Sequence, residues 1–160
     1  MIYLIGSSII KKWNFPLNSI NLGIGRLLTN QLQSLILPKI NVNDSIVFYC
    51  GGNDIRKQFD IEYTYNNIVL FLSLLNCQDI YVISIVKCKK IYDIGRNIDT
   101  DLLNDKLRKL CLNNGYHYIE SNLIFDYCLI DNECNLCKED GVHLQNEGYD
   151  KLEELIAISK

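Results

Sequence analysis

The chain has 160 residues, of which 48% are hydrophobic and 22% charged, and its formal net charge is −3. This length suits one self-sufficient core, so we expect residues 1–160 to form a single domain that needs neither a disulfide nor a metal to fold. The mildly acidic balance argues against nucleic acid and membrane as partners, and no apolar run reaches the ~18 residues of a transmembrane helix.

Apolar runs rich in β-formers alternate with helical patterns along the chain. The runs are nearly continuous, which is typical of parallel strands that are covered on both faces. We expect five strands, over residues 2–5, 19–21, 45–50, 80–86 and 116–119.

Helices are expected between these strands and after the last one. One begins at a cap at Asp60, a second begins after Asp99 or Thr100 and stops at Gly115, and a third begins near Asn146. Strands that alternate with helices through short, right-handed crossovers predict a three-layer α/β/α domain around a five-stranded parallel sheet.

Four short polar blocks occur at the ends of these expected elements. Three of them directly follow the first three strands, where a parallel sheet binds its ligands, and the fourth precedes the last helix. The blocks are Gly6-Ser7-Ser8, Asn21-Leu22-Gly23, Gly51-Gly52-Asn53-Asp54 and Asp140-Gly141-Val142-His143.

Together the blocks contain the groups that a serine esterase needs. Ser8 is the candidate nucleophile, His143 the base, and Asp140 the carboxylate that orients this base. The Ser8 N–H, the Gly23 N–H and the Asn53 side-chain amide are candidate donors to an oxyanion. Each block alone is common turn chemistry, but all four in this order favour a hydrolase.

Two other motifs predict different chemistry. The stretch Gly23-Ile24-Gly25 lacks the third glycine of a dinucleotide fingerprint and follows the wrong strand. Zinc-knuckle spacing at Cys134 and Cys137, near Cys128 and His143, allows a Cys₃His site, but that site would consume the only plausible base. We therefore expect no metal and no cofactor, and we interpret His117 as a structural residue.

The seven cysteines are odd in number and lack the spacing of a disulfide framework. The first strand begins at Ile2, which leaves no room for a signal peptide. We therefore expect reduced thiols and a cytoplasmic protein, and the sequence leaves the oligomeric state open.

The four blocks resemble those of the SGNH (GDSL-like) hydrolase family, in the branch similar to platelet-activating-factor acetylhydrolases and carbohydrate acetylesterases. The resemblance runs from Tyr3 to Tyr149 and extends beyond the blocks, to Trp13, Ile24-Gly25, Leu144, Asn146 and Gly148-Tyr149. One departure is a Ser7 where the best-known motif has Asp. The other is Gly25-Arg26-Leu27 after the second block, where relatives often have another Gly and Ser or Thr.

This resemblance implies a flavodoxin-like SGNH fold, a triad of Ser8, Asp140 and His143, and an oxyanion hole formed by Ser8, Gly23 and Asn53. It also implies that Asp54 is a structural brace and that no cofactor takes part. The expected function is hydrolysis of small acyl esters, acetyl above all, with acetylated sugars among the candidate substrates.

Three alternatives remain open at this point. The chain could be a catalytically inactive SGNH-fold binding module, an acylhydrolase for small lipids or thioesters, or a structural-zinc module. Covalent labelling of Ser8 by a fluorophosphonate distinguishes an active enzyme from an inactive pocket, and metal content tests the zinc hypothesis.

Overall fold

A computed structural model of the chain describes residues 1–87, 94–123, 135–138 and 143–159. Within these residues, five parallel strands form one sheet, in the order β2-β1-β3-β4-β5. The strands are β1 (Ile2–Gly6), β2 (Ser19–Asn21), β3 (Ser45–Tyr49), β4 (Asp79–Ile83) and β5 (His117–Ile119). Because all five are parallel, their carboxyl ends share one edge of the sheet, and the predicted five-stranded parallel sheet is confirmed.

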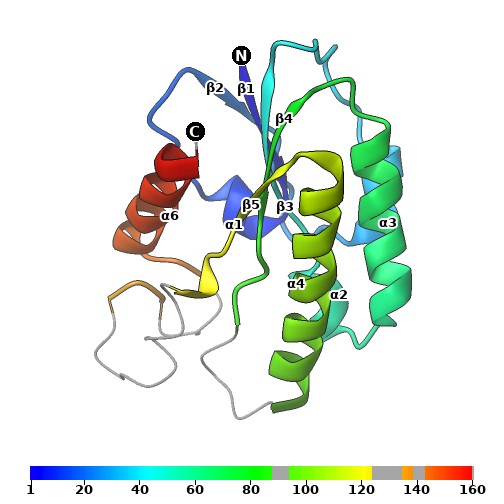
Figure 1. The fold of residues 1–160 in the computed structure, drawn as a ribbon. Helices are drawn as coiled ribbons and strands as arrows, with labels where there is room; N and C mark the ends of the chain where they lie inside the picture. The colour runs from blue at the N-terminus through cyan, green and yellow to red at the C-terminus, as the bar shows by residue number, and fades with distance from the viewer. Residues whose placement is uncertain (88–93, 124–134, 139–142, 160) are drawn as a thin grey trace.

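Helices cover both faces of this sheet (Figure 1). The helices are α1 (Ser8–Lys11), η1 (Thr29–Ser34), α2 (Gly52–Arg56), α3 (Ile61–Ser73), α4 (Ile94–Asn114) and α6 (Asn146–Ser159). Figure 1 shows α1 and α6 on one face and α3 and α4 on the other, which confirms the three-layer architecture. None of the helices that the structure describes is long and apolar enough to cross a membrane.

The core explains why the apolar runs form strands. The central strands β1, β3 and β4 are buried along almost their whole length, with Leu4, Ile46 and Ile80 fully enclosed. Side chains on both faces of each strand are removed from water, since helices pack against the sheet from each side. Continuous apolar runs were therefore the correct signal for these strands.

Two predicted boundaries are wrong. α4 begins at Ile94 rather than after Asp99 or Thr100, because the Thr100 hydroxyl donates to the Arg96 carbonyl one turn earlier inside the helix (2.7 Å) instead of capping it. β4 ends at Ile83 rather than at residue 86, because a side-chain amide replaces the ladder: Asn104 bonds both the N–H (2.7 Å) and the carbonyl (2.9 Å) of Ile85.

Other boundaries agree with the sequence. α3 starts after Asp60, whose carboxylate accepts a hydrogen bond from the Tyr63 N–H (3.0 Å), and α4 ends just before Gly115. α6 begins at Asn146 as expected. The sequence analysis did not predict η1 or α2, which are only six and five residues long.

A set of contacts joins α6 to α1. The Trp13 indole N–H donates to the Glu153 carboxylate (2.8 Å), and the Tyr149 hydroxyl donates to the Ile9 carbonyl (2.7 Å). The Trp13 and Tyr149 rings also pack together, with their centroids 5.4 Å apart. These contacts fix the start of α6 against α1, and thus fix the segment that carries His143 relative to the helix that begins with Ser8.

Candidate active site

Ser8 lies at the turn from β1 into α1. Gly6 has φ +153°, and a Cβ at this position would lie 1.9 Å from the Tyr49 carbonyl oxygen, so only glycine fits between β1 and β3 here. The Ser7 N–H then donates to the same carbonyl (3.1 Å), and the chain turns into α1. Within the described part of the chain, neither the N–H nor the hydroxyl of Ser8 has a hydrogen-bond partner, so both are available to a ligand.

Asn53 comes from α2, at the end of the neighbouring strand β3. Its Nδ2 donates to the Leu27 carbonyl (3.0 Å), and its Oδ1 accepts a hydrogen bond from the Arg56 guanidinium. These two bonds fix the plane of the amide and leave one Nδ2 hydrogen for a ligand.

Asp54, the next residue, is fully buried and points away from this chemistry. Its carboxylate accepts from the Thr29 N–H (3.0 Å) and the Thr29 hydroxyl (2.6 Å), and more weakly from the Thr64 hydroxyl (3.5 Å). Burial raises the pKa of this carboxyl, and the Thr29 hydrogen bonds oppose that rise. Asp54 therefore braces α2 against η1 and α3, as the sequence resemblance implied.

Gly23 lies tightly against α1. A Cβ at this position would lie 2.3 Å from the backbone nitrogen of Lys11. The Gly23 N–H donates to Oδ1 of the Asn21 side chain (2.9 Å). Asn21 in turn donates to the carbonyl oxygens of Ile10 (2.7 Å) and Trp13 (3.1 Å). Gly23 thus packs the loop against α1. Its role as an oxyanion donor remains a prediction, which requires that the hydrogen bond from the Gly23 N–H to Asn21 breaks.

The next two residues of this loop have a different geometry. Arg26 has φ +62°, a left-handed conformation that favours glycine. Among the described residues, the N–H groups of Gly25 and Arg26 have no acceptor. The loop therefore presents two unengaged backbone donors just beyond Gly23.

His143 is positioned by a short antiparallel bridge that precedes α6. Cys137 pairs with Leu144, and the Lys138 N–H donates to the His143 carbonyl (2.8 Å). Gly148 lets this bridge approach α6, because a Cβ there would lie 2.3 Å from the Leu136 carbonyl oxygen. The predicted orienting residue, Asp140, lies outside the described residues.

Three of the predicted site residues line one cavity of about 540 Å³: Ser8, Asn53 and His143. They come from α1, α2 and the segment before α6, which are distant in sequence. Among the described residues, the structure places no hydrogen bond between Ser8 and His143. Gly23 is not among the residues that line the cavity, whereas Gly25 and Arg26 are.

A second, smaller cavity of about 40 Å³ adjoins the first at Ser8 and Asn53. Tyr49 lines it, and burial raises the pKa of this tyrosine to about 12, so its hydroxyl stays protonated and accepts the Val86 N–H (3.1 Å). Arg96 and Asn97 of α4 also line this cavity.

The structure describes two of the four residues of the alternative Cys₃His site, Cys137 and His143. Cys128 and Cys134 lie outside the described residues, and Cys137 is buried. Within the ranges that the structure describes, no group of three or more His, Cys, Asp or Glu side chains is arranged to hold a metal.

Sequence reasoning missed most of the basic residues around the larger cavity. They are Lys11, Lys12, Arg26, Arg56 and Lys57. A signal was present, since basic pairs follow the Ser8 and Asn53 blocks within three or four residues.

The fold has solved counterparts, which decide its class. A member of the lipolytic protein G-D-S-L family from Veillonella parvula superposes with a TM-score of 0.79 at 16% identity, over 98% of this chain and 96% of that one. The fold is that of the GDSL hydrolases. A GDSL-like lipase from Bacteroides thetaiotaomicron superposes with a TM-score of 0.77 at 18% identity, and the match covers 99% of this chain and 86% of the lipase.

An acetylxylan esterase from Geobacillus stearothermophilus also has this GDSL fold. Its TM-score is 0.78 at 14% identity, and the match covers 99% of this chain and 92% of the esterase. By sequence alone, no protein-family model and no curated protein matches the chain. The similarity therefore lies in the fold, and the four blocks carry the link to chemistry.

Proposed function

We propose that this protein is a serine ester hydrolase that cleaves small acyl esters, acetyl esters above all, through an acyl-enzyme on Ser8. The observation that carries the proposal is that Ser8, Asn53 and His143 line one cavity at the carboxyl edge of the sheet. The GDSL fold supports it, because proteins of this fold include lipases and an acetylxylan esterase.

In this mechanism His143 takes the proton of the Ser8 hydroxyl while Ser8 Oγ bonds to the ester carbonyl carbon. Asp140 holds the imidazole and stabilises its positive charge. The C–O bond to the alcohol then breaks, and the alcohol leaves with the proton from His143. Water, activated by His143, cleaves the acyl-enzyme, releases the acid and restores Ser8.

The oxyanion formed in each step needs hydrogen-bond donors. We assign the Ser8 N–H and Asn53 Nδ2, because the first has no partner and the second keeps one free hydrogen. The third donor comes from the loop of residues 23–26. Gly23 is the predicted donor, but its N–H is held by Asn21 (2.9 Å), so the unengaged N–H groups of Gly25 and Arg26 are alternative sources.

The cavity of about 40 Å³ beside Ser8 supports a short acyl chain. At about 10–15 Å³ per water molecule, this space holds about three waters, which is comparable to an acetyl group. A longer acyl chain exceeds this volume. Acetylated sugars are reasonable first substrates, since the acetylxylan esterase has the same fold.

The first test compares p-nitrophenyl acetate, butyrate and octanoate as substrates of the wild type, Ser8→Ala and His143→Ala. We expect acetate to be preferred, both variants to lose about 10³-fold or more in kcat, and the double variant to lose little more, because triad members act as a unit. Asn53→Ala should lose about 10²–10³-fold in kcat through its oxyanion contact.

Fluorophosphonate labelling provides the control for a poor choice of ester. Labelled wild type and unlabelled Ser8→Ala would mean that the nucleophile is active and that the true substrate is narrower than these esters. An unlabelled, well-folded wild type that hydrolyses none of the three would contradict the proposal and favour an inactive binding module.

A further inference from the structure

The larger cavity is strongly basic, although the chain as a whole has a net charge of −3. Five cationic side chains line it, and they come from three separate segments: Lys11, Lys12, Arg26, Arg56 and Lys57. None of the described residues that line this cavity is acidic. Five of the sixteen lysines and arginines of the chain therefore line the candidate site, with no described acidic side chain among them.

These cations are not used to hold the fold together. Among the described residues, ion pairs join other lysines and arginines to carboxylates, for example Lys106 to Glu62 (2.7 Å) and Lys87 to Asp101 (3.1 Å). The five side chains around the cavity form no such pair. Arg56 alone has a hydrogen-bond acceptor, the neutral Asn53 side chain.

Local positions bring the charges toward the cavity. The Lys11 ammonium reaches the loop, where it lies 3.9 Å from the place that a Cβ of Gly25 would occupy. Arg26 keeps a left-handed backbone at φ +62° beside it, and Lys57 follows the end of α2. Like charges gathered without partners repel one another, and a bound anion relieves that repulsion.

We propose that the alcohol part of the substrate carries an anionic group, a carboxylate or a phosphate, which these cations bind. This inference rests on the proposed function, because it takes the 40 Å³ cavity for the acyl group and the 540 Å³ cavity for the alcohol. The charge of the larger cavity then selects an alcohol that carries an anionic group, and the volume of the smaller cavity selects a short acyl chain.

The test uses aryl acetates that differ mainly in charge. The anionic probes are 4-acetoxybenzoate and 4-acetoxyphenyl phosphate, and the neutral probe is methyl 4-acetoxybenzoate. Each kcat/KM is divided by the rate of hydroxide-catalysed hydrolysis, which removes differences between leaving groups. At low salt, we expect the normalised kcat/KM of the wild type to be about tenfold or more higher for an anionic probe than for the neutral one. This preference should shrink as sodium chloride is raised to 0.5 M, because salt screens the attraction between the cations and the probe. Comparing the two anions shows whether a carboxylate or a phosphate is the better match.

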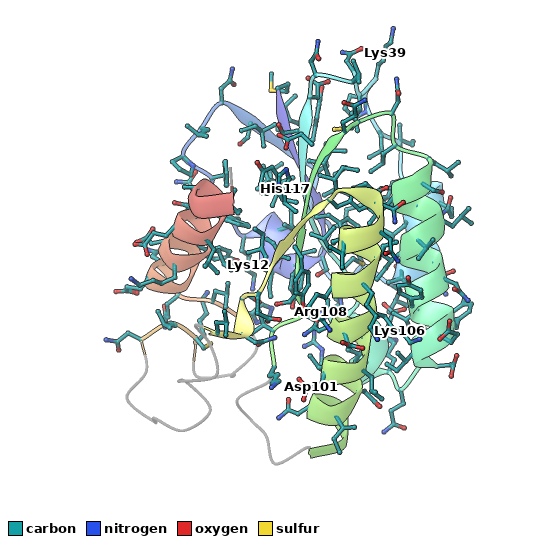
Figure 2. All side chains as sticks on the ribbon, in the orientation of Figure 1. Lys12, Lys39, Asp101, Lys106, Arg108 and His117 are labelled. Carbon is teal, nitrogen blue, oxygen red and sulfur yellow. The ribbon has the colours of Figure 1, made fainter. Side chains whose placement is uncertain are left out.

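Charge reversal identifies the residues responsible. Lys12→Glu removes a cation from the cavity, and Lys39→Glu makes the same change at an exposed lysine that also lacks an acidic partner. Figure 2 places Lys39 at the end of the molecule where β1 begins, away from Lys12. Lys12→Glu should reduce the ratio of kcat/KM for the anionic probes to kcat/KM for the neutral probe about three- to tenfold, whereas Lys39→Glu should leave this ratio unchanged. Thermal unfolding of both variants checks that the fold is intact.

A binding measurement separates this inference from the proposed function. Calorimetry compares the products 4-hydroxybenzoate and methyl 4-hydroxybenzoate, which need no turnover. Tighter binding of the anion that Lys12→Glu removes is expected, and it would support a cationic site even if no ester were cleaved. Equal binding of the two products, or an anion preference that Lys12→Glu leaves intact, would overturn the inference whether or not the esterase is active.

Discussion

At the scale of single residues, the backbone at the site is under constraints that only certain side chains tolerate. Gly6 and Gly23 have no room for a Cβ, whereas Arg26 occupies a left-handed conformation that normally suits glycine. A non-glycine residue in this conformation costs about 1–3 kcal/mol. The basic side chain is therefore held at the cavity at some expense of stability, which suggests that it serves the ligand rather than the fold.

Arg26→Gly should raise the free energy of unfolding relative to Arg26→Ala by about 1 kcal/mol, because both variants lose the charge but only glycine relieves the left-handed strain. Urea unfolding at one ionic strength measures the difference. Both variants should also show a weaker preference for anionic esters. If alanine proved as stable as glycine, the conformation of residue 26 would not be strained.

At the scale of the elements, one buried carboxylate connects three helices. Asp54 of α2 accepts both hydrogen bonds from Thr29 of η1, and Thr29 and Thr64 are themselves fully buried. A buried donor that loses its acceptor costs about 1–3 kcal/mol. The same network places Asn53, the neighbour of Asp54, over the cavity.

Asp54→Ala should lower the free energy of unfolding by about 2–5 kcal/mol, because it leaves the N–H and the hydroxyl of Thr29 without an acceptor. Chemical denaturation measures this loss, and Asp60→Ala provides a milder comparison, since it removes only the exposed cap of α3. A loss of less than 1 kcal/mol at Asp54 would mean that water replaces the carboxylate.

The pH dependence of Asp54 has a definite sign. Because burial raises its pKa above the value of 3.8 in the unfolded chain, the folded state binds more protons than the unfolded state between the two values. This group's contribution to stability therefore declines as pH rises from 3.8 through the folded-state pKa, and it is constant above it. Asp54→Asn should lack that decline when both proteins are unfolded in urea at pH 4, 5 and 7.

The elements that could be predicted from the sequence are those whose burial leaves an apolar pattern in the chain. Strands β1, β3 and β4 are buried on both faces, so their apolar runs located them to within a few residues. The edge strand β2 matched its expected bounds of 19–21 although it is mostly exposed. The start of α4 was missed because Thr100 is a good capping residue whose hydroxyl bonds instead to Arg96 inside the helix.

The sequence predicted three side chains that line the cavity, but it did not predict how the neighbouring loop is arranged around them. The blocks led to Ser8, Asn53 and His143, which share a cavity, because each follows or precedes an element whose end the apolar pattern marks. The engagement of Gly23 with Asn21 and the position of Arg26 depend on the path of the loop in three dimensions, which local sequence does not encode. The lysines and arginines that follow the Ser8 and Asn53 blocks, by contrast, were visible in the sequence.

At the scale of the whole molecule, the candidate nucleophile and base lie near opposite ends of the chain. Ser8 begins α1, and His143 precedes α6, so the docking of α6 on α1 decides their separation. The Tyr149 hydroxyl contributes directly, by donating to the Ile9 carbonyl (2.7 Å) next to Ser8.

Tyr149→Phe should lower the free energy of unfolding by about 1–2 kcal/mol, because the buried Ile9 carbonyl loses its donor while the ring packing remains. It should also lower kcat on p-nitrophenyl acetate severalfold with little change in KM, since it loosens His143 relative to Ser8 without touching the cavity. Tyr63→Phe, on an exposed face of α3, is the matched control. Equal kcat values in wild type and Tyr149→Phe would show that α6 docks without this bond.

The junction of α1 and α6 also gives the protein an optical signal of its own. The chain has one tryptophan, and its indole is only 3% exposed, enclosed between the two helices. Its fluorescence should therefore shift to longer wavelength when α6 leaves α1, even if the sheet stays folded. Circular dichroism follows the whole backbone, so coincident transitions by the two methods would mean that the last helix and the sheet unfold as one cooperative unit. A fluorescence change at lower denaturant than the circular dichroism change would instead reveal a state in which the sheet is folded but α6 has separated from α1.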